Sequence, residues 1–215
     1  MNSRPLPPLL ILIAILSGCA TVGDGAPDYS KTRETVLTEP GDSAEAGHEI
    51  ARAAVELIGR RDLTVRGRRF SFDCTGTVLA AYYAAGYDLA ANFGAYTGNG
   101  VRRLYMMADD YGTLRNDTPL RPGDIIFWDN SYDRNEDRRY NDEFTHAGIV
   151  VAVERDDTIT YVHHNYRRGV VMAKMNLRRP SDMDRNTPMR MASHRWRDSD
   201  PWLSGELYRA HGALY

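Results

Sequence analysis

The order in which apolar residues are spaced along the chain is the feature that most limits its fold. The first half of the 215 residues carries apolar side chains at helical spacing, and the second half carries short β-branched runs instead. Helices that precede strands favour an α+β domain with a largely antiparallel sheet over alternating βα units. We therefore expect N-terminal helices packed on a central antiparallel sheet.

The periodicity also predicts where the individual elements lie. Asp42 or Ser43 would cap the first helix, and Gly86 stands where a helix-ending glycine is common. The helices are expected over residues 43–60, 73–85 and 101–111. The strands are expected over residues 125–128, 146–154, 158–164 and 169–176. Between them, 63–72 is interpreted as loop or short extended structure, and 180–215 as mixed structure that packs back on the domain.

The N-terminus has the pattern of an export signal. Arg4 precedes an apolar run over 9–16, which is too short to span a bilayer and fits a signal peptide. The segment ends in Leu-Ser-Gly-Cys at Cys19, which resembles a bacterial lipobox; an ordinary signal peptide with a coincidental cysteine is the alternative. The resemblance implies acylation of Cys19 and a lipid anchor, and Ala20 after the cysteine favours the outer membrane, facing the periplasm.

The domain organisation follows from this signal. We expect a lipoprotein signal peptide over 1–18, a flexible tether over 19–42, and one folded domain over 43–215, as a monomer. The chain has 27 basic and 29 acidic residues and no basic run with interleaved aromatics, so nothing indicates a nucleic-acid partner.

Cys74 is the candidate nucleophile. It stands at the predicted start of the second helix, where the helix dipole and free N–H groups are expected to lower a thiol pKa and to hold an oxyanion. The alternative for a lone cysteine is a small buried apolar residue. The flanking Asp73 and Thr75-Gly76 favour an exposed helix start.

His146 is the candidate base, because it opens a predicted strand and can face a neighbouring helix end. A hairpin would bring the next strand beside it, so His163 could hydrogen-bond the His146 imidazole and Asn165 could assist. Alternation turns His164 to the other face, where we expect it to meet solvent. No role is assigned to His48, His194 or His211.

Four motifs in this order resemble a known family. The segments DCTG, RPGDIIFW, HAGIVVAV and YVHHN are similar to those of the NlpC-type cell-wall cysteine peptidases and of the related CHAP amidohydrolase/peptidase group, over roughly residues 45–175. The resemblance implies a papain-like fold, with Cys74 as nucleophile, His146 as base and His163 as the third polar residue. Asn165 falls where CHAP members often have Asn.

Two departures from the NlpC-type pattern affect the expected pocket. The usual Tyr and Gly-Gly before the cysteine motif are missing from 63–72, and the polar segment 129–144 is longer than usual. Asp133, Asn135 and Asp137 alternate as in a calcium loop, but Phe144 stands where the bidentate Glu should be. We therefore expect no metal and no cofactor, and interpret 129–144 as a solvated loop that faces the substrate.

The resemblance implies hydrolysis of peptidoglycan stem peptides through an acyl-enzyme, most often between D-Glu and the diamino acid. Two other functions remain open. The missing tyrosine motivates a non-catalytic envelope module that holds peptidoglycan, and the same fold could serve an amidase or acyltransferase with another acyl substrate.

Overall fold

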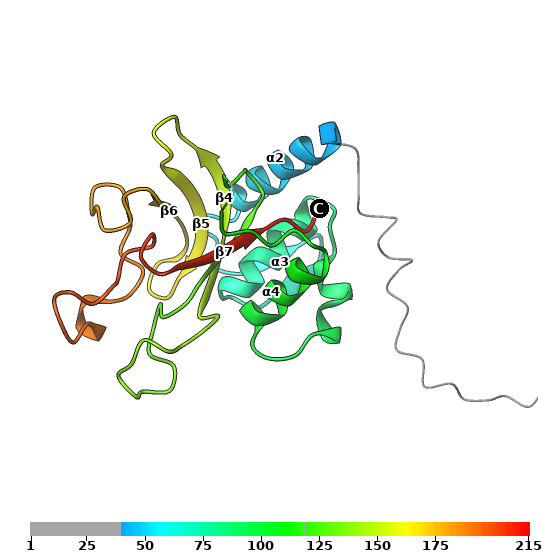
Figure 1. Ribbon diagram of the computed structural model, residues 1–215. Coiled ribbons are helices and arrows are strands. Elements are labelled where there is room, and N and C mark those ends of the chain that lie inside the picture. The colour runs from blue at the N-terminus through cyan, green and yellow to red at the C-terminus, as the bar shows by residue number, and fades with distance from the viewer. Residues whose placement is uncertain (1–39, 118) are drawn as a thin grey trace, which may run out of the picture.

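The structure is a computed structural model that describes residues 40–117 and 119–215 (Figure 1). The predicted signal peptide, the proposed acylation site at Cys19 and most of the tether lie outside the described residues. Three helices come first, namely α2 (Pro40–Glu56), α3 (Cys74–Ala84) and α4 (Gly100–Asp110). No helix in this described part is long and apolar enough to cross a membrane.

A five-stranded sheet follows, in the order β6-β5-β4-β3-β7, and every neighbouring pair is antiparallel. The α+β fold class is therefore confirmed. Its strands are β3 (Ile125–Trp128), β4 (His146–Val153), β5 (Ile159–Asn165), β6 (Gly169–Met175) and β7 (Tyr208–Gly212). The short elements are β1 (Leu63–Val65), β2 (Arg68–Phe70), η1 (Leu89–Ala91), η2 (Phe93–Ala95) and η3 (Ala192–His194).

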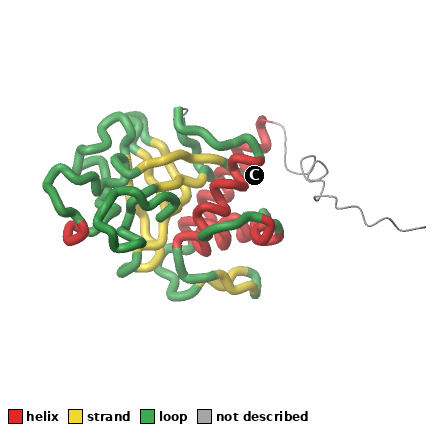
Figure 2. Tube along the Cα trace, turned by 60° about the horizontal axis from the view of Figure 1, so that its bottom comes forward, coloured by secondary structure: helices red, strands yellow, loops and turns green. Residues whose placement is uncertain are grey.

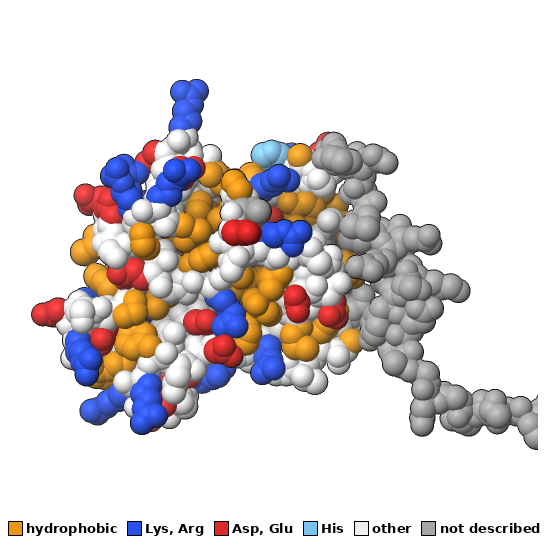
Figure 3. Space-filling model, viewed as in Figure 1, with side chains coloured by type: hydrophobic (Ala, Val, Ile, Leu, Met, Phe, Trp, Pro, Cys, Tyr) orange, Lys and Arg blue, Asp and Glu red, His pale blue; other side chains and the backbone are white. Residues whose placement is uncertain are grey.

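The sheet separates two apolar clusters. The helices cover one face, and the long connections that follow β6 cover the other (Figures 1 and 2). Because strand side chains alternate, Phe127 and Ile149 join the helix-side cluster, whereas Trp128 and Tyr161 join the loop-side cluster. On the face shown in Figure 3, basic and acidic side chains are interspersed over the surface.

The first helix differs from the prediction at both ends. It begins at Pro40 rather than at Asp42 or Ser43, so residues 40–42 of the predicted tether belong to the helix. Proline suits a helix start because its fixed φ is already helical. The helix ends at Glu56 rather than Arg60, and Gly59 follows with a φ of +76° that helical backbone does not adopt.

Three strands lie in the segments predicted as loop or short extended structure (63–72) and as mixed structure (180–215). Residues 63–70 form the hairpin β1–β2, whose turn residues Arg66 and Gly67 have φ of 48° and 79°. Two consecutive positive φ angles are typical of the tight turn that matches the twist of a hairpin. Near the C-terminus, β7 adds an unpredicted edge strand beside β3.

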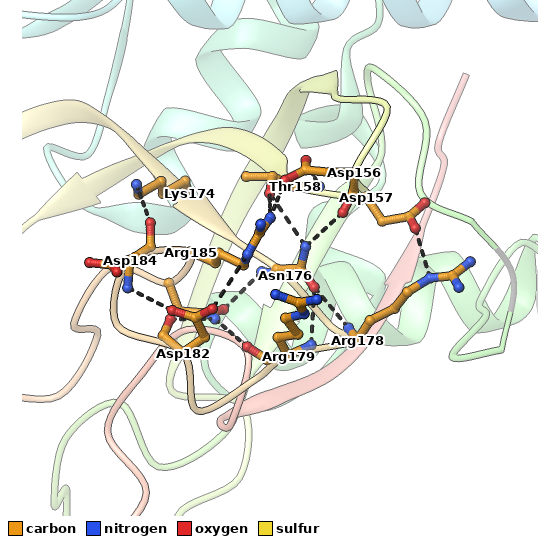
Figure 4. Close-up of polar contacts among 11 residues, drawn as sticks. Asp156, Asp157, Thr158, Lys174, Asn176, Arg178, Arg179, Asp182, Asp184 and Arg185 are labelled. Carbon is orange, nitrogen blue, oxygen red and sulfur yellow. Dashed lines mark hydrogen bonds and ion pairs between the residues drawn. The ribbon is translucent and has the colours of Figure 1, made fainter.

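The connection after β6 is held by two asparagines (Figure 4). Asn176 Nδ2 donates to the Asp156 carbonyl at 3.0 Å, and the Asn186 side chain accepts from the Asn176 N–H at 2.8 Å. Arg185 pairs with Asp156 across the same cluster. These contacts fix the connection over the loop-side face of the sheet.

Candidate active site

Cys74 is the first residue of α3, where the helix start meets the sheet. The Asp73 side chain caps this helix by accepting from the Gly76 N–H at 2.7 Å. Gly76 is required by contact, because a Cβ there would lie 1.8 Å from the Ser71 carbonyl oxygen. The DCTG motif therefore supplies a cap and a close approach that together place Cys74 at the helix tip.

The thiol of Cys74 is a free, partly buried group. It lies against the backbone N–H of Ala147, the residue that follows His146 in β4. Burial, and next the Asp73 carboxylate, raise its pKa above the ordinary thiol value. The expectation of a lowered thiol pKa is thus wrong, because burial and the Asp73 charge both disfavour the thiolate.

His146 and His163 form the hydrogen bond that the hairpin geometry suggested. His146 Nε2 lies 2.8 Å from His163 Nδ1, and the ring centroids are 5.0 Å apart. The register of β4 and β5 aligns Gly148 with His163, and a Cβ at Gly148 would lie 3.2 Å from the Trp128 ring. The small residue at 148 therefore allows Trp128 and His163 to approach each other beside His146.

Aromatic rings enclose the imidazole pair. Trp128 lies 5.8 Å from the His146 ring and Tyr161 lies 5.3 Å from the His163 ring, measured between centroids. Burial, and next the charge of His164, lower the pKa of His146 to about 4. Burial also holds the pKa of His163 well below its ordinary value, assisted by the charge of His146. Both rings are consequently neutral near pH 7.

Two neutral imidazoles can share this bond in only one direction at a time. If His146 Nε2–H donates to His163 Nδ1, the Nδ1 lone pair of His146 is left to accept a proton. His163 Nε2 is buried and has no hydrogen-bond partner among the described residues. A general base requires the arrangement in which His146 Nε2–H donates to His163, because His146 Nδ1 is then free to take a proton. His163 would orient the His146 ring through this bond.

Asn165 and His164 lie differently from the prediction. Asn165 Oδ1 accepts from the N–H groups of Arg167 and Arg168, at 3.0 and 3.2 Å, so it shapes the β5–β6 turn. Within residues 40–117 and 119–215, no hydrogen bond joins it to either imidazole. His164 is half-buried rather than fully exposed to solvent, because its ring packs edge-on against Phe72, with centroids 4.6 Å apart.

The remaining histidines lie away from this pair. His48 is exposed on α2, and His194 is half-buried in η3. His211 is buried in β7, where its Nδ1 lies 2.7 Å from the Tyr208 hydroxyl. Sequence reasoning missed this environment, because β7 itself was missed.

The segment 129–144 borders the site, as predicted, but its base is not solvated. Ser131 donates through its N–H and its hydroxyl to Thr145 Oγ1, both at 2.9 Å, directly before His146. Ser131 and Phe144 are buried, while Tyr132 is half-exposed within electrostatic reach of the Cys74 thiol. No local sequence pattern points to Tyr132, because its place depends on how the loop folds back.

The aspartates of this loop hold its backbone. Asp133 Oδ2 accepts from the Arg138 N–H at 2.9 Å, and Asp137 Oδ1 accepts from the Arg139 N–H at 2.9 Å. In the part of the chain that the structure describes, no group of three or more His, Cys, Asp or Glu side chains is arranged to hold a metal ion.

Comparison with known families gives one match and one negative result. The CHAP domain family model matches residues 65–165, a range that contains Cys74, the His146–His163 pair and the 129–144 loop. No curated protein matches the chain. A CHAP domain indicates a cysteine- and histidine-dependent amidase or peptidase that acts on peptidoglycan. Through residues 65–165 the chain thus resembles the CHAP domain family of papain-like cysteine hydrolases.

Proposed function

We propose that the protein is a cysteine endopeptidase that cleaves peptidoglycan stem peptides. The observation that carries the proposal is the hydrogen bond of 2.8 Å between His146 and His163, beside the Ala147 N–H against which the Cys74 thiol lies. A thiol, a base and a group that orients the base are the parts that acyl-enzyme chemistry requires. The CHAP match supplies the substrate class.

The proposed reaction starts from neutral partners. His146 Nδ1 takes the proton of Cys74 as the sulfur attacks the amide carbon, and the free N–H groups at the start of α3 stabilise the oxyanion. The imidazolium then gives its proton to the leaving amine, and a thioester remains on the sulfur. Water, deprotonated by His146, attacks the thioester and releases the acid and the thiol.

Digestion of purified sacculi by the wild-type protein and by Cys74→Ala tests this function. We expect the substitution to lower the release of soluble fragments on the order of 10³-fold or more, because the nucleophile is lost. Thermal melting of both proteins controls for folding. Undiminished release by the variant would contradict the mechanism, and no release by either protein would favour a module that holds peptidoglycan without cutting it.

Mass spectrometry of the products separates the peptidase from the amidase. Cleavage between D-Glu and the diamino acid leaves an exposed amine on the diamino acid, whereas an amidase would release the whole stem peptide from the sugar. We also propose that Cys19 carries a lipid that holds the protein at the outer membrane, facing the periplasm, which the lipobox pattern over 16–19 supports.

A further inference from the structure

The β5–β6 turn, residues 166–168, lies beside the segment that leads to the nucleophile. Gly59 donates its N–H to the Val170 carbonyl at 3.2 Å, which joins the end of the turn to the chain after α2. A Cβ on Gly169 would lie 3.2 Å from the Phe72 ring, two residues before Cys74. The turn therefore borders the approach to Cys74.

The backbone of this turn is fixed, and its side chains face outward. Asn165 Oδ1 holds the N–H groups of Arg167 and Arg168, and Gly169 closes the turn with a φ of +71°. Tyr166 is 90% exposed, more than any other large apolar side chain that the structure describes, and both arginines are exposed. Asn165 thus presents one aromatic ring and two guanidinium groups to solvent.

Neither guanidinium is neutralised by a neighbour. Some arginines elsewhere pair with carboxylates, for example Arg178 with Asp157 at 2.7 Å and Arg209 of β7 with Asp129 at 2.7 Å. Among the described residues, no such ion pair or side-chain hydrogen bond involves Arg167 or Arg168, which use only their backbone N–H groups. The positive charge of Arg168 contributes, after burial and the charge of His146, to the lowered pKa of His163.

The facing segments add two guanidinium groups and two carboxylates. Arg60 and Arg61 are exposed on the segment whose Arg60 carbonyl oxygen would lie 3.9 Å from a Cβ on Gly169. Asp62 accepts from the Thr64 N–H, and Asp73 caps α3. On these segments the four arginines 60, 61, 167 and 168 therefore outnumber the two carboxylates, which both accept backbone N–H groups.

We propose that Tyr166, Arg167 and Arg168 form a recognition site for a carboxylate of the substrate, next to Cys74. This inference rests on the proposed function and adds a substrate requirement to it. Stem peptides carry free carboxylates, including the α-carboxylate of D-Glu beside the proposed scissile bond. A guanidinium binds a carboxylate through paired, charge-assisted hydrogen bonds, and the exposed ring of Tyr166 offers an apolar face to the peptide beside it.

Kinetics on two stem peptides test the site, one with the free D-Glu α-carboxylate and one with that group amidated. We expect the wild-type protein to prefer the free acid about tenfold in kcat/KM, the effect of one charge-assisted bond. The double variant Arg167→Gln/Arg168→Gln should lose this preference through a higher KM for the acid, with kcat nearly unchanged. Arg178→Gln, at the other end of β5, is the matched control and should keep the preference.

Binding to the inactive Cys74→Ala protein gives a readout that does not depend on turnover. Calorimetry should show tighter binding of the acid than of the amide, and the difference should vanish when both arginines are also replaced. Equal binding of the two peptides by Cys74→Ala would overturn the recognition site, even if the wild-type protein cleaves them. A wild-type protein that cleaves neither peptide, yet binds the acid more tightly, would instead overturn the proposed hydrolysis and leave the recognition site supported.

Discussion

At the scale of single residues, Cys74 and His146 are held in their neutral forms by the same cause. Burial raises the pKa of the thiol and lowers the pKa of His146 to about 4. For the proposed reaction, these shifts favour general-base catalysis, in which the proton moves as the sulfur attacks, over a thiolate–imidazolium pair formed before the substrate binds. Because a neutral thiol reacts slowly with alkylating reagents, slow alkylation of Cys74 would not distinguish an enzyme from a non-catalytic module that holds peptidoglycan.

His163 is predicted to act by orienting His146. His163→Ala removes the Nδ1 atom that lies 2.8 Å from His146 Nε2, so we expect kcat to fall about 10²-fold with KM nearly unchanged. His163→Gln keeps an acceptor at the end of its side chain and should recover part of the loss. Steady-state kinetics on soluble muropeptides measure both effects.

The control for this prediction is His48→Gln, an exposed histidine on α2 that should leave both constants unchanged. Melting curves separate a loss of orientation from a loss of folding, because His163 is buried. A His163→Ala protein that folds and keeps the wild-type kcat would remove His163 from the mechanism.

The site residues show where sequence reasoning stops. The contact between His146 and His163 could be anticipated, because strand alternation and a hairpin determine it. Asn165 could not be separated from His163 by alternation, although its carboxamide binds the turn instead. The placement of Tyr132 depends on how Ser131 binds Thr145, a tertiary contact without a local pattern.

At the scale of elements, the helices and strands with a regular buried face were predictable, and β7 was not. The spacing of apolar residues located α3, α4 and the strands β3 to β6, with boundaries shifted by at most one residue. In β7, Arg209 and His211 interrupt any apolar run, and the strand is defined by its pairing with β3. Its identity therefore comes from tertiary structure.

The turn before β3 carries a prediction about stability and pH. Asp124 is buried, its Oδ2 accepts from the Arg121 N–H at 2.8 Å, and burial raises its pKa to about 6. A raised carboxyl pKa means that the fold binds the proton more tightly than the unfolded chain does. The stabilisation of the fold by protonated Asp124 is fully present below the ordinary carboxyl pKa of 3.8, which applies to the unfolded chain. It is lost as the pH rises through about 6.

We therefore expect Asp124→Asn to raise the free energy of unfolding at pH 8, by at most about 2–3 kcal/mol, and to change it little at pH 4. The amide removes the buried charge and keeps an acceptor for Arg121. Denaturant unfolding at the two pH values measures the difference. Wild-type protein unfolded in the same way controls for other groups that titrate between pH 4 and pH 8. An equal change at both pH values would show that the charge of Asp124 is not the cause.

At the scale of the whole molecule, the hydrolase fold extends beyond the matched family segment. The match covers 65–165, yet β6 and β7 form the two edges of the sheet and α2 packs on its helix-covered face. Met175 at the end of β6 and Leu207 in the connection that follows also join the loop-side cluster that contains Trp128. The segments outside the match thus support the strands that carry the imidazole pair.

We predict that membrane anchoring through Cys19 and catalysis at Cys74 are independent of each other. The proposed acylation site, Cys19, precedes the matched segment 65–165 in the sequence, and that segment contains Cys74 and the imidazole pair. We expect Cys19→Ser to move the protein from the membrane fraction to the soluble fraction and to abolish palmitate incorporation, because the acyl chains provide the attachment. Release of muropeptides by the purified variant should equal that of the wild-type protein.

Cys74→Ala is the reciprocal control, since it should stay acylated and membrane-bound without activity. A Cys19→Ser protein that still sediments with membranes would contradict the lipid anchor and leave the proposed chemistry at Cys74 untouched.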